Sequence, residues 1–338
     1  MIDVLVAGGG PAGLATAIHA TLAGMEAVVV EPRPNPVDKA CGEGVMPGGV
    51  RSLRALGVAP AGLELRGIRY VDGPHLAEAV FRDGTGLGVR RTELSAALAR
   101  RAAGLGVRVL PGRVGEVRQD PDGVTAAGLR ARWLVAADGL HSPVRRELGL
   151  DLPGRGPRRY GLRRHYRLPP WSDFVEVHWS REGEAYVTPV ADGLVGVAVL
   201  STARRTYDTY LDHFPELADR LRDGTAVSGV RGAGPMRQRV RGRVAGRVLL
   251  VGDAAGYVDA LTGEGIALAL ASAEAAVRCL RAGRPQEYDA AWRRMSRRHR
   301  LLTEALLRAS CRREGARLIV PAAARMPLLF AAAVHALQ

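Results

Sequence analysis

Cysteine is scarce in this sequence, and its three cysteines form no pair at metal-binding spacing. Cys41, Cys279 and Cys311 are odd in number, and no C-x-x-C motif occurs. These facts argue against a disulfide framework and against a zinc site, so we expect no bound metal. Cys279 and Cys311 are expected to be packing residues on helices. Because no signal peptide precedes the first apolar segment, a reducing, cytoplasmic location is also expected.

Aromatic residues make up only 5% of the 338 residues, and lysine occurs once, at Lys39. The core must therefore be mostly aliphatic. The formal net charge of +14 comes almost entirely from arginines that are spread along the chain. No aromatic residues interleave with these arginines as a base-stacking surface requires, so we expect no nucleic-acid partner. Solvated arginine faces and phosphate-bearing cofactors explain the charge more simply.

The chain also lacks an uninterrupted apolar run of about eighteen residues, the length that predicts a membrane-spanning helix. The closest approach is the stretch 318–338, which Pro321, Arg325 and Pro327 interrupt. This stretch predicts a packed terminal helix with at most peripheral membrane contact.

What the sequence does contain begins at its first residues. The apolar segment Ile2–Ala7 predicts a buried strand, residues 15–23 predict a helix of small residues, and residues 27–30 predict a second strand. A glycine-rich turn joins the first strand to the helix. This strand–turn–helix–strand order is typical of a dinucleotide-binding unit.

The glycines of that turn have the spacing G-x-G-x-x-G. Gly8 permits a tight turn, Gly10 lets backbone N–H groups approach a pyrophosphate, and Gly13 lets the helix pack closely on the strand. Glu31 follows about twenty residues later and can accept hydrogen bonds from a ribose. The position of this fingerprint at the start of the chain favours FAD over NAD as the resident cofactor.

Two later motifs also join an apolar strand to a turn. Residues 133–137 lead into Asp138 and Gly139, after which Ser142 begins a helix. Residues 248–251 lead into Gly252 and Asp253, followed by T-G-E-G-I at the start of a second helix of small residues. Asp253 is placed to bind a hydroxyl-rich chain, and the N–H groups near residues 263–266 would face an electron-rich ring.

In this order and spacing, the three motifs resemble those of the FAD-dependent hydroxylase superfamily typified by p-hydroxybenzoate hydroxylase. The segments D-K-A-C-G-E-G at 38–44 and L-T-G-E-G-I at 261–266 are most similar to the geranylgeranyl reductase branch. Ala260 departs from the proline that the family usually has there. The W-x-W-x-I-P signature of flavin halogenases is absent from the sequence, so halogenation is not expected.

The resemblance implies an α/β fold. It has a Rossmann-like FAD-binding domain of the glutathione reductase type, an antiparallel β-sheet substrate domain and C-terminal helices. Along the chain we predict a discontinuous FAD-binding domain over 1–68, 89–157 and 237–283. A substrate domain is predicted over 69–88 and 158–236, and a helical segment over 284–338.

The motifs and the resemblance assign a set of site residues. Cofactor-binding roles fall on Gly8, Gly10, Pro11, Ala12, Gly13, Glu31, Arg33, Cys41, Gly42, Arg91, Asp138, Gly139, Gly252, Asp253, Gly263, Glu264, Gly265 and Ile266. Trp179, Tyr186 and Pro189 are either sheet core or the wall of a substrate pocket over the flavin. Cys41 is the candidate catalytic residue. We expect nearby cations and backbone N–H groups to lower the pKa of its thiol, with pocket shaping as the alternative role.

The expected chemistry is that of an oxidoreductase, since FAD supplies the redox step. No second G-x-G-x-x-G occurs, so NAD(P)H is expected to visit as a transient electron donor without a domain of its own. Hydroxylation of a hydrophobic small molecule in a biosynthetic pathway is favoured. Reduction of a carbon–carbon double bond is the alternative, and a non-catalytic carrier of prenyl groups or lipids is a third possibility from another class.

Overall fold

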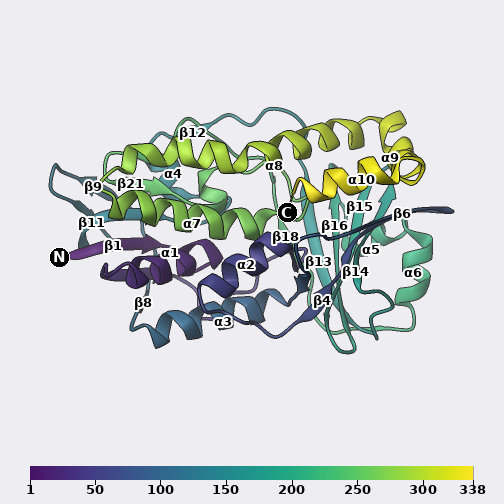
Figure 1. Ribbon diagram of the computed structural model, residues 1–338, viewed down its shortest axis with the longest axis horizontal. Coiled ribbons are helices and arrows are strands. Elements are labelled where there is room, and N and C mark those ends of the chain that lie inside the picture. The colour runs from purple at the N-terminus through teal and green to yellow at the C-terminus, as the bar shows by residue number, and fades with distance from the viewer. Residues whose placement is uncertain (338) are drawn as a thin grey trace.

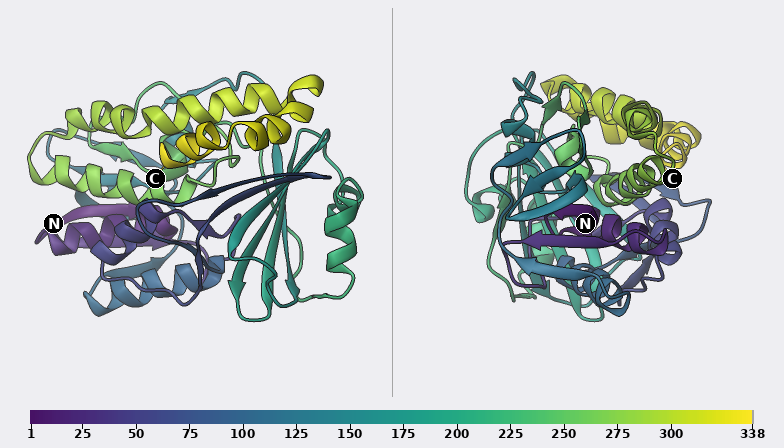
Figure 2. Two further views of the ribbon diagram at one scale, coloured as in Figure 1. Left: turned by 45° about the vertical axis from the view of Figure 1, so that its right-hand side comes forward. Right: turned by 90° about the vertical axis from the view of Figure 1, so that its left-hand side faces the viewer.

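The computed structural model describes residues 1–337, apart from the side chains of residues 313 and 314. A largely parallel sheet covered by helices forms one half of the molecule, and a second sheet forms the other (Figures 1 and 2). A helical segment at the end of the chain runs along both halves. This arrangement confirms the fold class that the sequence predicts.

The first sheet has the strand order β20-β21-β11-β1-β2-β8. From β21 to β8 the strands run parallel. The strands β1, β2 and β21 are buried on both faces, which explains their continuous apolar runs. A hairpin of β9 and β10 extends the sheet beside β11. The strands are β1 (Ile2–Ala7), β2 (Ala27–Glu31), β8 (Arg108–Pro111), β9 (Val117–Gln119), β10 (Val124–Ala126), β11 (Leu129–Ala136), β20 (Val244–Ala245) and β21 (Val248–Leu250).

Helices of small residues cover this sheet closely. Helix α1 packs against both α3 and α7, and α2 packs against α7. The alanine-rich faces of α1 and α7 let the two backbones approach, which sets the start of α7 near the start of α1. The helices are α1 (Pro11–Leu22), α2 (Pro47–Ala55), α3 (Arg91–Gly104), α4 (Pro143–Glu147) and α7 (Gly265–Arg281), with a 3₁₀ turn η1 (Gly252–Ala255) before α7.

The second sheet has the order β17-β13-β16-β15-β14-β5-β6, with β18 also paired to β13. It is antiparallel except where β14 runs parallel to β5. The sequence predicted that strands near residue 70 join this sheet, but not that parallel pair. The strands are β5 (Gly67–Asp72), β6 (His75–Val80), β13 (Tyr160–Arg167), β14 (Phe174–Ser180), β15 (Gly183–Ala191), β16 (Leu194–Ser201), β17 (Thr225–Ala226) and β18 (Arg231–Ala233).

Each face of the second sheet has its own apolar core. Helices α5 (Tyr207–Leu211) and α6 (Pro215–Leu221) cover one face. The other face packs against α9, α10 and the segment before α7. The remaining strands form the small sheet β3-β7-β4 and the pair β12-β19. These strands are β3 (Gly44–Val45), β4 (Leu63–Leu65), β7 (Gly86–Gly88), β12 (Asp151–Leu152) and β19 (Arg239–Val240).

The C-terminal segment is helical, as the sequence predicts, but its last part is two helices and not one. A short turn η2 (Pro285–Glu287) leads into α8 (Tyr288–Ser310), which is followed by α9 (Arg313–Arg325) and α10 (Pro327–His335). Within residues 1–337 no one helix has both the length and the apolarity to cross a bilayer. Residues 315–325 and 327–335 reach that criterion only jointly, and they meet at an angle of 102°.

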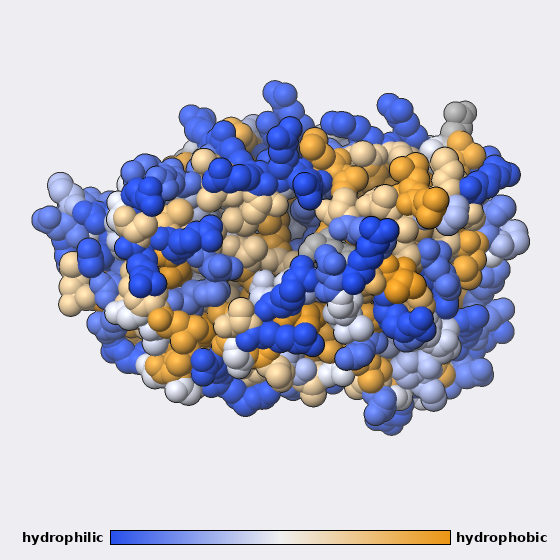
Figure 3. Space-filling view, viewed as in Figure 1, coloured by the Kyte–Doolittle hydropathy of each residue, from blue (hydrophilic) through white to orange (hydrophobic). Residues whose placement is uncertain are grey.

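Exposed apolar side chains gather on this last part. Leu318, Leu328 and Leu329 are exposed, with Leu328 at 86%. Figure 3 shows apolar residues over α9 and α10, bordered by charged residues. Cys279 is buried in α7, as expected for a packing residue, whereas Cys311 at the end of α8 is exposed. The packing prediction is therefore wrong for Cys311, because the helix ends there and leaves it uncovered.

Candidate active site

The turn between β1 and α1 requires glycine. Gly8 has φ of +103°, and a Cβ atom there would lie 2.6 Å from the carbonyl oxygen of Ala137. A Cβ atom on Gly13 would lie 1.8 Å from the carbonyl oxygen of Gly8. Both contacts are with backbone, so no side-chain rotation relieves them. Pro11 is the first residue of α1 and Ala12 is buried behind it, as the fingerprint predicts.

A buried guanidinium borders the start of α1. The nearest neighbour of a Cβ atom on Gly10 would be a guanidinium nitrogen of Arg91, at 3.8 Å. Arg91 is buried, and its Nε has no hydrogen-bond partner among residues 1–337. The first N–H groups of a helix also lack partners within the helix. An unpaired guanidinium beside such a helix end fits an anionic phosphate.

Glu31 is fixed at the other edge of the glycine turn. Its carboxylate accepts hydrogen bonds from the N–H of Gly9 and from Nε of Arg33, each at 2.7 Å. Burial opposes ionisation, but the bonds from Arg33 and Gly9 lower the pKa of Glu31 overall. The sequence predicted a ribose ligand here. The structure adds that the same carboxylate orients the turn.

The second motif supplies another unpaired buried group. One carboxylate oxygen of Asp138 accepts the N–H of Val144 at 3.1 Å. The other is buried and has no protein partner in the described chain. Burial raises the pKa of Asp138, with hydrogen bonds from Ser142 and Val144 acting against it. A ligand that donates a hydrogen bond would satisfy the free oxygen, as the predicted cofactor-binding role requires.

The third motif meets the first two. A Cβ atom on Gly252 would lie 2.8 Å from Cβ of Ala12, so the first residue of η1 packs on the start of α1. Burial raises the pKa of Asp253, whereas Lys39 and Arg91 act to lower it. Nζ of Lys39 lies 3.1 Å from the position of a Cβ on Gly139. The sole lysine therefore links the 38–44 loop to both later motifs, which the sequence did not predict.

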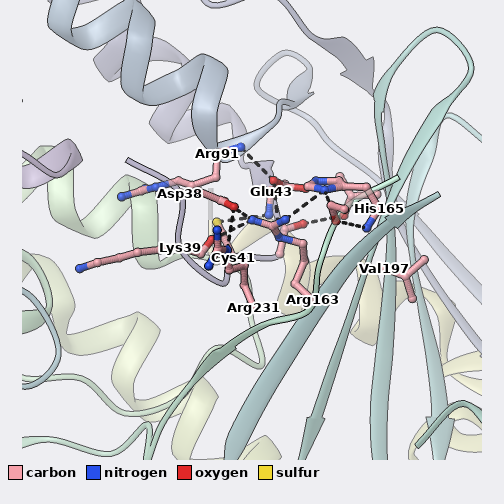
Figure 4. A network of polar contacts seen from close by, with 12 residues as sticks. Asp38, Lys39, Cys41, Glu43, Arg91, Arg163, His165, Val197 and Arg231 are labelled. Carbon is pink, nitrogen blue, oxygen red and sulfur yellow. Dashed lines mark hydrogen bonds and ion pairs between the residues drawn. The ribbon is translucent and has the colours of Figure 1, made fainter. Parts of the chain in front are cut away.

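Glu43 in that loop is at the centre of a buried network (Figure 4). Glu43 and His165 are each 1% exposed, and Nε2 of His165 lies 2.7 Å from one carboxylate oxygen of Glu43. The other oxygen accepts the backbone N–H of Arg91 at 2.9 Å. Nη1 of Arg163 lies 3.0 Å from Nδ1 of His165. A guanidinium can only donate, so Nδ1 accepts and Nε2 carries the proton that is donated to Glu43.

The network ties the loop to the second sheet. Arg163 pairs with Asp38 and donates to the carbonyl oxygen of Lys39 at 3.1 Å, while Arg231 pairs with Asp38 at 3.1 Å. Arg163 and His165 lie on β13. In Figure 4 the charged ends of Lys39 and Arg91 point away from this network. The network therefore holds one side of the loop, and the charged groups of Lys39 and Arg91 face the three motifs.

Cys41 lies in the same loop, two residues before Glu43. Its sulfur accepts the N–H of Glu43 at 3.3 Å, and the residue is partly exposed. The expected lowering of its pKa is wrong. Burial of the sulfur by neighbouring protein atoms raises the pKa and outweighs the cation Arg91. Cys41 is therefore a thiol at neutral pH. Gly42 beside it is exposed, with open space around a Cβ position.

The T-G-E-G-I segment forms the N-terminus of α7. Gly263 has φ of +70°, and a Cβ there would lie 3.4 Å from Cε of Met46, next to the 38–44 loop. Gly265 begins the helix, Ile266 is buried after it, and the hydroxyl of Tyr257 lies 3.4 Å from a Cβ position on Gly265. The sequence missed Tyr257, because a single tyrosine in a turn gives no signal of its own.

Glu264 occupies the N-cap position of α7 and is 8% exposed. Burial alone raises its pKa to about 8. Glu264 is therefore a neutral carboxylic acid at pH 7. With Cys41, it makes two protonated acids in the segments that the resemblance places at the flavin.

Glu264 should give stability a specific pH dependence. Its folded pKa of about 8 lies above the ordinary value of 4.5, so the folded state keeps a proton that the unfolded state loses between these values. The free energy of unfolding should therefore fall as pH rises from about 5 to 8. The variant Glu264→Gln should lose this slope. Urea unfolding of both proteins at several pH values measures it, and equal slopes would contradict the prediction.

The predicted substrate residues lie on the second sheet, facing these segments. Trp179 and Tyr186 belong to the apolar core under α9 and α10, and the hydroxyl of Tyr186 donates to the carbonyl oxygen of Leu261 at 2.9 Å. A Cβ on Gly88 would lie 1.7 Å from the carbonyl oxygen of Pro189, so Pro189 is a backbone contact to β7. Tyr186 thus borders the L-T-G-E-G-I segment as well as forming core, and Trp179 belongs to the core beside Tyr70.

A buried ion cluster holds the second sheet against the segment before α7. Arg159 pairs with Glu184, and Nη1 of Arg159 lies 3.4 Å from Asp259. All three residues are at most 3% exposed. Burial raises the pKa of Glu184 to about 7, although Arg159 opposes that shift. The sequence missed this cluster, because its members come from three distant segments.

The chain's similarity to known proteins agrees with this geometry. Residues 1–283 match the family model described as "FAD binding domain". The chain belongs to this family. The glycine turn, the unpaired Arg91 and the free oxygen of Asp138 fit FAD. The protein is thus an FAD-dependent oxidoreductase of the hydroxylase and reductase superfamily.

Three relatives with known names carry different activities. The chain is 31% identical to a menaquinone reductase of Mycolicibacterium smegmatis, over 88% of this chain and 80% of that protein. It is 30% identical to digeranylgeranylglycerophospholipid reductase 1 of Methanothermobacter thermautotrophicus, over 78% and 73%. It is also 30% identical to a rifampicin monooxygenase of Streptomyces venezuelae, over 81% and 62%.

Solved structures support the fold of this chain. A geranylgeranyl bacteriochlorophyll reductase-like protein from Thermoplasma acidophilum matches with a TM-score of 0.80 at 23% identity, covering 94% of this chain and 90% of that one. The flavin-dependent brominase Bmp2 matches with a TM-score of 0.83 at 19% identity, covering 99% and 93%. At these identities the likeness concerns the fold alone.

Proposed function

We propose that this protein is an FAD-dependent reductase that hydrogenates a carbon–carbon double bond in an apolar, polyprenyl-type substrate, with NAD(P)H as the electron donor. The observation that carries the proposal is the pair of protonated acids in the flavin-binding segments. Burial raises the pKa values of Cys41 and Glu264, so both groups hold a proton at neutral pH.

Such acids match what hydrogenation asks of a protein. Reduction of a double bond adds a hydride to one carbon and a proton to the other. Reduced FAD is the source of hydride in this chemistry. The protein must supply the proton, and a thiol or carboxylic acid that stays protonated at pH 7 can do so. The acid that gave the proton then takes up another proton from solvent.

The surroundings of the flavin segments favour an apolar substrate. Met46, which reaches Gly263, belongs to the same apolar core as Leu261, Trp179 and Tyr186. This core continues to Phe330 on α10, whose ring packs 4.7 Å from that of Tyr70. Side chains of this kind bury an aliphatic chain favourably and offer it few polar partners. The names of the two reductase relatives, which refer to menaquinone and a geranylgeranyl lipid, support the same substrate class.

Hydroxylation, which the sequence favours, is the second candidate. Its support is the similarity to the rifampicin monooxygenase, although the chain covers only 62% of that protein. The neutral state of Cys41 and Glu264 shifts the proposal to reduction, because neither group is poised as a base to activate a hydroxyl. The carrier alternative requires that the protein bind no flavin.

One anaerobic experiment tests the proposal. Purified protein loaded with FAD is reduced by NAD(P)H and mixed with a polyprenyl quinone such as menaquinone, and the product is analysed by mass spectrometry. We expect a product whose polyprenyl chain, located by fragmentation, carries two added hydrogen atoms in the absence of oxygen. Reduction of the quinone ring to the quinol adds two hydrogen atoms as well, so the ring is reoxidised before the analysis. A product that appears only in air and contains an added oxygen atom would establish hydroxylation instead. Colourless protein that cannot be reconstituted with FAD would leave the non-catalytic carrier as the remaining candidate function.

Cys41→Ala tests the thiol directly. If Cys41 gives the proton, hydrogenation should slow by about a hundredfold or more. The visible spectrum of the bound flavin and its rate of reduction by NAD(P)H should stay unchanged, and Cys41→Ser should retain part of the activity. Cys279→Ala, in α7, is the matched control. Full activity in Cys41→Ala would reduce Cys41 to pocket shaping and leave Glu264 as the donor.

A further inference from the structure

A small cavity of about 200 Å³ lies between β19, the segment after η1, and α8. Its lining includes Arg237, Arg239, Arg243, Arg300 and Trp292. Among the described residues, none of those assigned to FAD lines it. The cavity is therefore a site apart from the one built by the three motifs.

The lining carries an excess of positive charge. Four guanidinium groups face one carboxylate, Glu304, which already binds Arg237 at 2.6 Å. His299 adds no charge, because burial and Arg300 lower its pKa to about 4. From outside the lining, Asp289 binds Arg243 at 2.8 Å. Cations gathered in a part-buried cavity repel one another, so an anion in the cavity would be stabilised.

Several donors in the lining are buried without a protein partner. Arg243 is 6% exposed, and its Nε is unpaired within residues 1–337. The same holds for Nε of Arg237 and Nε1 of Trp292. The guanidinium carbon of Arg243 lies 3.4 Å from the centre of the Trp292 ring, and Arg300 lies 5.6 Å from it. Both guanidinium groups thus lie within 5.6 Å of the centre of one indole ring, from which they can donate to a multidentate anion.

The cavity wall is continuous with the flavin-binding loop. Gln238 and Tyr257 exchange backbone hydrogen bonds of 2.9 and 3.1 Å, and the other end of Tyr257 lies beside Gly265. Arg145 donates to the side-chain oxygen of Gln238 at 2.8 Å and to the carbonyl oxygen of Ala254 at 3.2 Å. A single layer of residues, which includes Gln238 and Tyr257, therefore separates a ligand in the cavity from η1.

We propose that this cavity is a phosphate subsite that holds a phosphate or diphosphate group of the nicotinamide dinucleotide donor. The assignment to the donor rests on the proposed function. The volume is below the roughly 300–1,000 Å³ of pockets that enclose whole ligands, so the cavity takes the phosphate group and leaves the rest of the donor outside. A phosphorylated substrate presents the same chemistry, and the experiment distinguishes the two sources.

Isothermal titration calorimetry of the FAD-loaded protein with inorganic diphosphate tests the subsite without any turnover. We expect saturable binding that weakens by about tenfold or more in Arg300→Ala and in Arg239→Ala, since each removes a charged donor. Arg297→Ala is the matched control, because it removes the same charge from another exposed position on α8 that does not line the cavity. No binding to the wild type, or equal weakening in Arg297→Ala, would overturn the subsite.

The source of the phosphate is tested by flavin reduction. If the donor occupies the subsite, Arg300→Ala should raise the NAD(P)H concentration that gives half-maximal reduction by about tenfold and leave the limiting rate unchanged. If flavin reduction depended on the NAD(P)H concentration as in the wild type, the assignment to the donor would be overturned. A phosphorylated substrate would then remain as the source of the phosphate. Dithionite can reduce the bound FAD without any dinucleotide. If the wild-type protein fails to hydrogenate the substrate even with dithionite as the reductant, the proposed function fails and the subsite does not.

Discussion

Gly13→Ala is expected to yield protein that is colourless and markedly less stable than the wild type. The new Cβ would lie 1.8 Å from the carbonyl oxygen of Gly8, which is backbone held by the strand β1. The turn must therefore open. Overpacking of a rigid core costs about 1–3 kcal/mol, and a clash between two backbones lies at or above the top of that range. An opened turn also moves the N–H groups at the start of α1 away from the pyrophosphate.

The measurements are the ratio of flavin to protein absorbance after purification and the free energy of unfolding in urea. Gly104→Ala is the matched control: it makes the same change at the last residue of α3, where a Cβ meets nothing within 4 Å. That variant should be as yellow and as stable as the wild type. A Gly13→Ala protein with a full complement of FAD would show that the close approach of α1 to the turn is not needed.

The parts of the site that the sequence predicted are those coded by local pattern. The glycine turn, Asp138 and Asp253 each follow within three residues of the end of an apolar strand, and parallel strands bring such turns to one edge of the sheet. The motif order therefore predicted both the fold and the convergence. Arg91, distant in sequence, could be assigned by resemblance only, and the structure places it beside Gly10.

The parts that the sequence did not predict depend on contacts between the two sheets. Arg163 and His165 belong to the mostly polar run R-R-H-Y-R at the end of β13, a pattern that equally suits a solvated face. Whether such residues are buried depends on what covers the sheet, and here the 38–44 loop covers it. The wrong expectation for the pKa of Cys41 has the same origin. Charge near a thiol can be read from a sequence, whereas desolvation by folded neighbours cannot.

Loss of the buried pair of Glu43 and His165 should have a large effect on the free energy of unfolding and on FAD binding. Glu43→Ala should lower the free energy of unfolding by about 3–5 kcal/mol, because it leaves the buried Nε2–H of His165 without its acceptor and removes the carboxylate that lies 3.9 Å from Nε of Arg163. It also removes the bond to the N–H of Arg91. The guanidinium that borders Gly10 would then be less well fixed. The affinity for FAD should therefore fall together with stability.

Glu43→Gln separates shape from charge. The amide fills the same space and can still accept from His165 or Arg91, so its cost should be only about 1–3 kcal/mol. Glu64→Ala, an exposed carboxylate on β4, is the control and should stay within about 0.5 kcal/mol of the wild type. Urea unfolding and FAD titration of the apoprotein measure both effects. If Glu43→Ala matched Glu64→Ala in both, the loop would owe its position to the main chain alone, and the network would have no part in building the flavin site.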